Sequence, residues 1–345
     1  MHYAFYADVT RPTPGLPVHP QQAPKSKERL VALDEATQQL LRTLAAAPDA
    51  VPLASLTPVQ ARALSSSRAT AYAPGPEILD TTNFLLPVSG NSNIRMRIHT
   101  PTTTPTSVLL YLHGGGWVIG DLDTYDSLAK NLAHESGATV VLAEYRKAPE
   151  FPFPIPVEDA WAAYCWVVEN LEQLASLDAK LHIAGDSAGG NLAAVIARRA
   201  RDAAVGNLAS QILIYPVVDH DLSRTSYLER ENQTLLPKAA MEYFWGHYAP
   251  DAQDRKHQDA SPLHCTDLSA LPNALIITAE HDVLRDEGEH YALALTEAGV
   301  HVEHHRWLGQ MHGFIQMVGI LPASLEVTRL IARHISENEQ LESEA

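Results

Sequence analysis

Residues 180–193 read KLHIAGDSAGGNLA, in which an apolar run meets a Gly-x-Ser-x-Gly sequence and continues into a helical pattern. Small residues at Gly185 and Gly189 allow a strand and a helix to approach closely, and the sharp turn between them would expose the hydroxyl of Ser187. The stretch therefore predicts a strand–turn–helix unit with Ser187 as a candidate nucleophile. The simpler alternative is a turn in which Ser187 only caps the helix.

The chain around this unit alternates between short apolar runs and helical patterns. Strands that alternate with helices pair in parallel through right-handed crossovers, which leaves helices on both faces of the sheet. We therefore predict an α/β fold with a mostly parallel central sheet flanked by helices. The expected strands are 93–100, which has the polar–apolar alternation of an antiparallel strand, 107–113, 138–145, 180–186, 211–218 and 274–280, and the expected helices are 157–171, 187–202 and 285–299.

Two segments depart from this alternation. Leucines recur at roughly helical spacing across residues 27–47, and Thr57 followed by Pro58 is a typical helix start. Helices laid over the core are therefore expected near the N-terminus. Residues 219–254 are aromatic toward their end and not strand-like, which indicates a helical insertion.

Three consecutive glycines follow an expected strand, in the sequence LHGGGW at 112–117. Consecutive glycines cost backbone entropy, which favours a role for their amide groups. The N–H groups of Gly114 and Gly115, with that of Ala188, could bind the oxygen that becomes negative during acyl transfer. A flexible turn or a phosphate-binding loop is the alternative, although no Lys-Ser/Thr pair follows the glycines. His113 is expected to anchor this loop.

A serine nucleophile needs a base, and the base needs an orienting acid. In folds of this kind the order along the chain is Ser, then Asp or Glu, then His. Asp282 comes just after an expected strand, and His312 lies in the loop LGQMHGF before the final helix, so both satisfy the order. Asp286 and Glu287 compete for the role of the acid, but they belong to the following helix.

The amino-acid composition argues against several classes of binding partner. Acidic residues outnumber basic ones by 41 to 25, and the net charge of −16 would repel a nucleic acid. Without a secretory signal or an apolar run of roughly 18 residues, the sequence indicates a cytoplasmic protein with no stable membrane anchor. Cys165 and Cys265 are expected to be free, at least partly buried thiols. No histidine or cysteine spacing fits zinc, and neither a metal nor another cofactor is expected.

Five ordered blocks resemble the hormone-sensitive-lipase-like family of α/β-hydrolases, which includes many bacterial carboxylesterases. The blocks are HGGGWVIGDLDTYD (113–126), EYRKAPEFPFPIPVEDA (144–160), GDSAGGNLA (185–193), EHDVLRDEG (280–288) and MHGF (311–314). This chain has Lys147 where the family commonly has Leu, and Val283 where it commonly has Pro. Neither departure removes a catalytic group.

The resemblance implies an α/β-hydrolase fold with a helical cap. In this reading residues 81–218 and 255–345 form the catalytic domain, while 1–80 supply N-terminal cap helices and 219–254 a cap insertion. The resemblance makes Ser187 the nucleophile, Asp282 the acid and His312 the base, and it gives oxyanion-hole donors at Gly114, Gly115 and Ala188.

The implied activity is hydrolysis of short- to medium-chain carboxylic esters through an acyl-enzyme, with a small-molecule ester as the partner. The same triad would also serve an amidase, a lactonase or a deacetylase. A non-catalytic receptor, similar to the plant gibberellin receptor, is disfavoured because that receptor has lost the histidine found here as His312. The family also suggests a homodimer. Cap aromatic residues expected to shape the substrate pocket are Trp117, Tyr243, Phe244 and Trp245.

Overall fold

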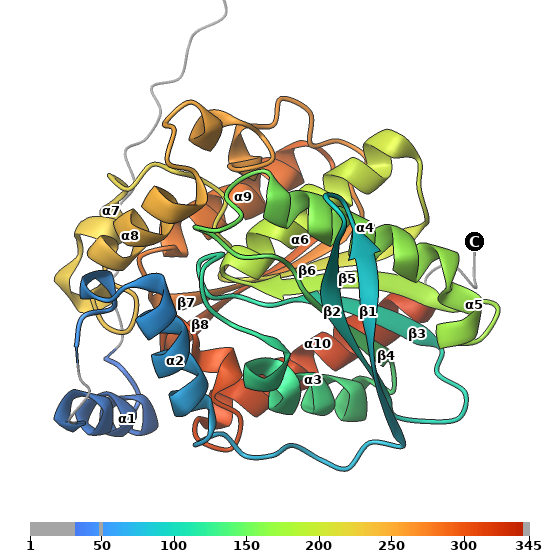
Figure 1. Cartoon of the computed structure of the whole chain (residues 1–345), viewed down its shortest axis with the longest axis horizontal. Helices are drawn as coiled ribbons and strands as arrows, with labels where there is room; N and C mark the ends of the chain where they lie inside the picture. The colour runs from blue at the N-terminus through green and yellow to red at the C-terminus, as the bar shows by residue number, and fades with distance from the viewer. Residues whose placement is uncertain (1–31, 48–50, 341–345) are drawn as a thin grey trace, which may run out of the picture. The chain divides into compact units, whose positions relative to one another are not determined.

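A computed structural model of the chain describes residues 32–47 and 51–340. Its centre is an eight-stranded sheet with the order β1-β2-β4-β3-β5-β6-β7-β8 (Figure 1). β1 pairs with β2 and β2 with β4 in antiparallel fashion, whereas every pair from β4 to β8 is parallel. The strands are β1 Asp80–Val88, β2 Ser92–Thr100, β3 Ser107–Leu112, β4 Thr139–Glu144, β5 Lys180–Asp186, β6 Leu208–Ile214, β7 Asn273–His281 and β8 Val302–Met311.

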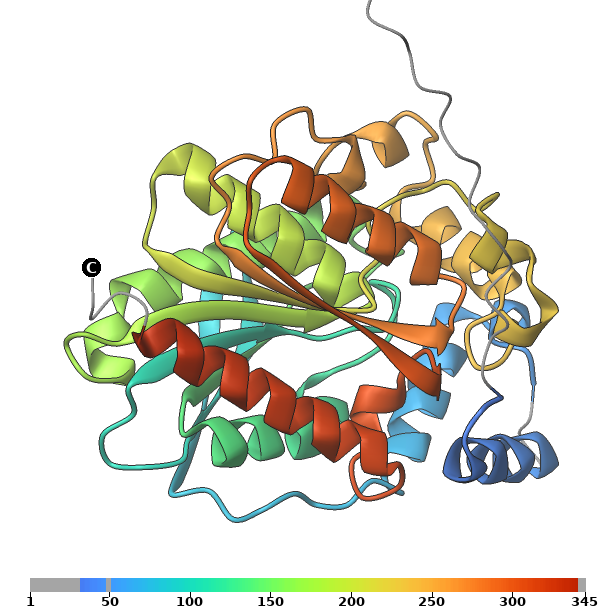
Figure 2. The same ribbon diagram turned by 180° about the vertical axis from the view of Figure 1, so that it is seen from behind.

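Helices cover both faces of this sheet (Figure 2). α3 and α10 contact each other on one face, and α4 and α6 do so on the other, where α9 packs against β7. The β3 side chains alternate between two buried apolar clusters, with Leu109 and Tyr111 in one and Leu110 and Leu112 in the other. The α-helices are α1 Glu35–Ala46, α2 Pro58–Ala69, α3 Leu122–Ser136, α4 Ile155–Glu169, α5 Leu171–Leu174, α6 Ala188–Ala203, α7 Thr225–Leu228, α8 Lys238–Tyr248, α9 Arg285–Glu297 and α10 Pro322–Gln340.

The predicted α/β fold and mostly parallel sheet are confirmed. The strand expected at 211–218 is displaced toward the N-terminus, since β6 begins at Leu208 and ends at Ile214. Tyr215 adopts a φ of 34° and precedes Pro216, so the extended conformation stops there. β1 and α3 were not among the expected elements. β1 is an edge strand that contains Pro87 and is largely exposed, so it lacks the apolar run of a buried strand.

Two helices of the N-terminal segment lie within the described residues. α1 begins after Asp34, whose carboxylate accepts a hydrogen bond from the Thr37 amide at 2.7 Å. Residues 27–31 of the expected first helix lie outside the described part of the chain. α2 begins where the sequence predicted, with Thr57 as its N-cap and Gln60 completing a capping box.

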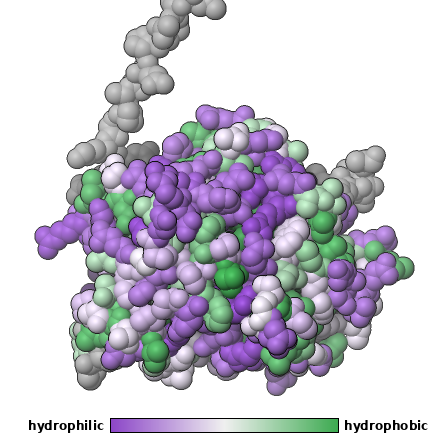
Figure 3. All heavy atoms as spheres, turned by 45° about the horizontal axis from the view of Figure 1, so that its top comes forward, coloured by the Kyte–Doolittle hydropathy of each residue, from purple (hydrophilic) through white to green (hydrophobic). Residues whose placement is uncertain are grey.

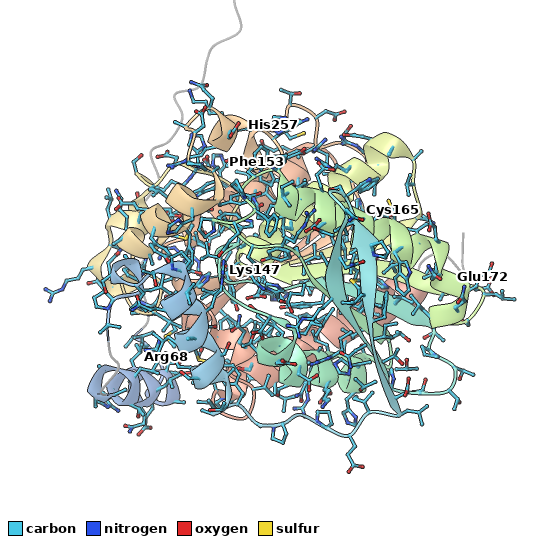
Figure 4. The ribbon with its side chains drawn as sticks, viewed as in Figure 1. Arg68, Lys147, Phe153, Cys165, Glu172 and His257 are labelled. Atoms are coloured by element: carbon cyan, nitrogen blue, oxygen red, sulfur yellow. The ribbon has the colours of Figure 1, made fainter. Side chains whose placement is uncertain are left out.

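The surface in Figure 3 is mostly hydrophilic, with apolar side chains scattered in small groups. Within residues 32–47 and 51–340, no helix combines the length and the apolar character needed to cross a membrane. Cys165, on α4 (Figure 4), and Cys265 are both free and partly buried, as expected.

Candidate active site

The turn between β5 and α6 holds Ser187 in a strained backbone conformation. Its φ of 55° and ψ of −119° are rare for a residue with a side chain, and its side chain makes no helix-capping hydrogen bond. The turn also requires glycine at position 189, since a Cβ there would lie 2.0 Å from the carbonyl oxygen of Leu112. The interpretation of Ser187 as a simple helix cap therefore fails.

The structure brings Ser187, His312 and Asp282 together at the carboxyl ends of the parallel strands. The Nε2 atom of His312 lies 3.0 Å from Ser187 Oγ, and its Nδ1 atom lies 2.7 Å from Asp282 Oδ2. Asp282 is fully buried, and its second oxygen accepts the amide of Leu284 at 2.9 Å. These contacts fix the plane of the imidazole and direct Nε2 toward the serine.

The two competing carboxylates have other partners. Glu287 is buried, and it accepts hydrogen bonds from the Val218 amide at 2.9 Å and the Tyr227 hydroxyl at 3.1 Å. Burial raises the pKa of Glu287 well above its usual range. Asp286 accepts the amide of Ser226 at 2.7 Å. Neither contacts His312 within the described residues, which leaves Asp282 as its acid.

In the glycine loop, the structure differs from the sequence prediction that the Gly114 amide binds the oxyanion. The Gly114 amide donates to Asp186 Oδ1 at 3.0 Å and to the Tyr125 hydroxyl at 2.8 Å, so it is not free to bind a substrate oxygen. The amides of Gly115 and Gly116 have no hydrogen-bond partner among the described residues. Ala188 is the first residue of α6, where an amide has no partner inside the helix. The available donors are therefore at Gly115, Gly116 and Ala188.

Asp186 is a residue of the site that the sequence reasoning missed. Its buried carboxylate accepts the Tyr111 hydroxyl at 3.0 Å, the Tyr125 hydroxyl at 2.9 Å and Gln316 Nε2 at 3.1 Å, in addition to the Gly114 amide. Burial raises its pKa, although these side-chain hydrogen bonds act in the opposite direction. Asp186 thus links the serine turn, the glycine loop and the segment after His312. The position of Asp186 inside the Gly-x-Ser-x-Gly sequence could have indicated its role in the site.

His113 anchors the glycine loop, as expected. Its ring stacks on Tyr145 with centroids 4.3 Å apart, and its Nδ1 atom lies 2.7 Å from the Gly114 carbonyl oxygen. Burial, with a contribution from the charge of Lys147, lowers the pKa of His113 from 6.5 to about 4. The imidazole is therefore neutral at physiological pH, and its Nδ1–H can donate to the carbonyl group.

The aromatic residues expected to line the pocket behave differently from one another. Trp117 and Trp245 expose none of their surface, so neither lines an open pocket, which corrects the expectation for both. Trp117, which directly follows the glycine loop, instead stacks on Tyr248 of α8 with centroids 4.0 Å apart. Phe244 packs directly on Gly116, where an added Cβ would lie 2.2 Å from its ring. Tyr243 is partly buried on the same helix, α8.

Two cavities open elsewhere on the described surface. One of about 390 Å³ is lined by Lys147 (Figure 4), Glu144 and Arg62, among others, and Lys147 Nζ binds Glu144 Oε1 at 2.9 Å. The other, of about 410 Å³, lies along β1 and β2. Neither includes a residue of the Ser187 site. Ser187 and His312 are only 6% and 8% exposed.

Comparisons with known proteins agree with this arrangement. Residues 109–316 match a family described by the alpha/beta hydrolase fold. Carboxylesterase NlhH of Mycobacterium tuberculosis is 40% identical over 245 residues, which cover 69% of this chain and 76% of that protein. Ethyl acetate hydrolase of Pseudomonas putida is 37% identical over 235 residues, or 67% of this chain and 73% of that protein.

Solved structures extend the similarity over more of the chain. The hyperthermophilic esterase of the archaeon Pyrobaculum calidifontis is 38% identical and superposes with a TM-score of 0.84, covering 89% of this chain and 99% of that one. An ester hydrolase from the Lake Arreo metagenome, complexed with a bipyridine phosphonate derivative, is 35% identical with a TM-score of 0.83. It covers 88% of this chain and 98% of its own.

Proposed function

This chain belongs to the α/β-hydrolase family, in its hormone-sensitive-lipase-like branch, and we infer that it is a serine carboxylesterase. The observation that carries this proposal is the contact of His312 with both Ser187 and Asp282, at 3.0 and 2.7 Å. A serine, an imidazole and a buried carboxylate connected in this way can run acyl transfer without any further reagent than water.

In the proposed mechanism Ser187 is the nucleophile. Neutral His312 takes the proton from its Oγ as that atom attacks the ester carbonyl, and Asp282 stabilises the imidazolium that forms. Collapse of the tetrahedral intermediate breaks the ester bond and releases the alcohol, which receives the proton from His312. Water then attacks the acyl-enzyme, with His312 again as the base, and the carboxylic acid leaves.

The oxyanion of each tetrahedral intermediate is proposed to lie against three backbone amides. Ala188 donates from the first turn of α6, where the helix dipole also favours a negative charge. Gly115 and Gly116 donate from the glycine loop. This set replaces Gly114, whose amide is already engaged by Asp186.

We propose short to medium acyl chains as the preferred substrates, such as the acetyl group named in the Pseudomonas relative. Phe244 of α8 packs against Gly116 of the proposed oxyanion hole, and we expect its ring to limit the space for an acyl chain. The cap of residues 1–80 and 219–254 stays a prediction; the contact of Phe244 with Gly116 and the hydrogen bond from Arg62 of α2 to the Val118 carbonyl oxygen at 2.8 Å support it. The homodimer and the cytoplasmic location stay predictions.

Hydrolysis of a series of p-nitrophenyl esters tests this function. We expect the highest kcat/KM at short or medium acyl length and a fall toward long chains, while the matching p-nitroanilides distinguish an amidase. Ser187→Ala and His312→Ala should each lower kcat by roughly 10⁴- to 10⁶-fold. Near-normal activity of Ser187→Ala would refute the mechanism, and a maximum at long chains would refute the substrate class.

A further inference from the structure

A second group of chemically active side chains lies outside the Ser187 site. Asp219 and His220 follow β6, and His264 ends the short 3₁₀ helix Pro262–His264. His264 Nε2 lies 3.0 Å and His220 Nδ1 lies 3.4 Å from the same oxygen, Asp219 Oδ1. Each residue thus offers one potential ligand atom, and the three atoms all lie within 4.8 Å of one another.

These distances fit the coordination sphere of a transition-metal ion. Zn²⁺ binds imidazole nitrogen and carboxylate oxygen at about 2.0–2.2 Å, so neighbouring ligand atoms of a tetrahedral site are roughly 3.3 Å apart. The separations of 3.0 and 3.4 Å bracket that value. The rings of His220 and His264 are inclined at 64° with centroids 5.0 Å apart, so they converge without stacking.

The surroundings hold the carboxylate in place. Arg224 binds the other oxygen of Asp219, Oδ2, which leaves Oδ1 directed at the two histidines. The backbone amides of His220 and Asp221 also donate to Oδ1, at 2.7 and 3.3 Å. Outer contacts of this kind orient metal ligands in proteins. Asp219 is only 3% exposed, whereas the side chain of His264 is 34% exposed, so an ion could enter from solvent and keep a water ligand.

A simple ion pair between Asp219 and His264 is the competing interpretation. It accounts for one histidine, whereas His220 Nδ1 lies 3.4 Å from Asp219 Oδ1 and 3.3 Å from Ser261 Oγ. We propose that Asp219, His220 and His264 form a binding site for a divalent transition-metal ion of the Zn²⁺ type. The sequence did not suggest this site, because Asp219 and His264 are 45 positions apart and match no zinc spacing.

The proposed ion is structural. None of its three ligands contacts Ser187, Asp282 or His312 among the described residues. It would instead clamp the segment after β6 to the turn at 262–264. That segment also contains Val217, whose amide donates to the carbonyl oxygen of Ser187 at 3.2 Å. Occupancy should therefore stabilise the fold beside the serine turn.

Metal titration of the chelator-treated, full-length protein tests the proposal. We expect one equivalent of Zn²⁺ to bind and raise the Tm, and Co²⁺ at the same site to give the visible absorption of four-coordinate cobalt. His264→Asn and His220→Asn should each abolish these signals. His134→Asn is the matched control, since His134 is an exposed histidine on α3, and it should leave them unchanged.

The proposal is wrong if the wild type does not bind Zn²⁺ stoichiometrically, or if His264→Asn binds Zn²⁺ as well as the wild type does. Circular dichroism of each metal-free variant establishes that it is folded, and the exposed position of His264 makes that variant the safer of the two. Because binding and Tm are measured without an ester, failure here leaves the carboxylesterase proposal untouched.

Discussion

Asp186 lies one residue before Ser187, and four donors converge on its carboxylate. They come from Tyr111, Tyr125, Gln316 and the Gly114 amide. An amide side chain offers one acceptor oxygen and would direct an NH₂ group at some of these donors. Asp186→Asn should therefore displace the glycine loop and lower kcat by roughly 10- to 100-fold, the usual cost of a hydrogen bond to a charged group.

Esterase kinetics measure this effect, and the split between kcat and KM is informative. The Asp186 carboxylate acts on the loop that is proposed to bind the oxyanion, so kcat should fall more than KM changes. Asp178→Asn is the matched control, since Asp178 is exposed, and its kinetics should equal those of the wild type. Unaltered kcat in Asp186→Asn would show that the loop does not depend on this carboxylate.

At this residue scale the sequence predicted the triad better than the oxyanion donors. The chain order of Ser187, Asp282 and His312 is a property of the sequence itself, and the three side chains do lie together. The engagement of Gly114 depends on a tertiary contact with Asp186, which no local pattern encodes. The burial of Trp117 against Tyr248 likewise depends on how α8 packs.

At the scale of elements, the side chain of Arg62 connects α2 to the catalytic domain by several hydrogen bonds. Arg62 donates to the carbonyl oxygens of Val118 and Ala148, each at 2.8 Å, and also pairs with Glu150. Val118 follows the glycine loop, so this contact connects the helix to the proposed oxyanion hole. The hydrogen bond to Glu150, together with the negative charge of that carboxylate, raises the pKa of Arg62.

Arg62→Ala should loosen this connection. We expect the free energy of unfolding to fall by about 2 kcal/mol, because the carbonyl groups of two buried residues lose a charged donor. We also expect kcat/KM to fall by roughly 10-fold as the loop gains freedom. Denaturant titration and esterase kinetics check the two effects.

The control for this variant lies on the same helix. The side chain of Arg68 (Figure 4) makes no hydrogen bond among the described residues, so Arg68→Ala should change neither quantity appreciably. Equal effects of the two substitutions would mean that α2 is held by its apolar face alone.

Elements with a strong local pattern were predictable, and those without one were not. α2 was found from Thr57 and Pro58, since an N-cap followed by proline is a local signal. β1 was missed because an exposed edge strand does not need an apolar run. The end of β6 was misplaced because the backbone turn at Tyr215 interrupts a stretch that stays apolar.

At the scale of the whole molecule, buried histidines make stability depend on pH. Burial lowers the pKa of His182 from 6.5 to about 3, and its Nδ1 atom lies 2.8 Å from Ser210 Oγ. In the unfolded chain the same imidazole binds a proton below a pH of about 6.5. Its contribution to stability is therefore complete above that pH and is lost as the pH falls toward 3.

His182→Gln removes this titration and keeps a polar partner for Ser210. The Tm of the wild type should therefore fall more steeply than that of the variant between a pH of about 7 and about 4.5. Both proteins keep the other titrating groups, such as Glu287, whose raised pKa changes stability in the opposite direction. The difference between the two slopes therefore reports the titration of His182. Parallel slopes would contradict a buried neutral His182, and His134→Gln should match the wild type.

We propose that Ser187 is an activated nucleophile, and its reaction with a fluorophosphonate probe is the most direct test. Intact-mass analysis followed by peptide mapping should find one adduct, on Ser187. His312→Ala should react far more slowly, because an unassisted serine hydroxyl is a poor nucleophile. An adduct on another residue, or equal labelling of the wild type and Ser187→Ala, would contradict the account.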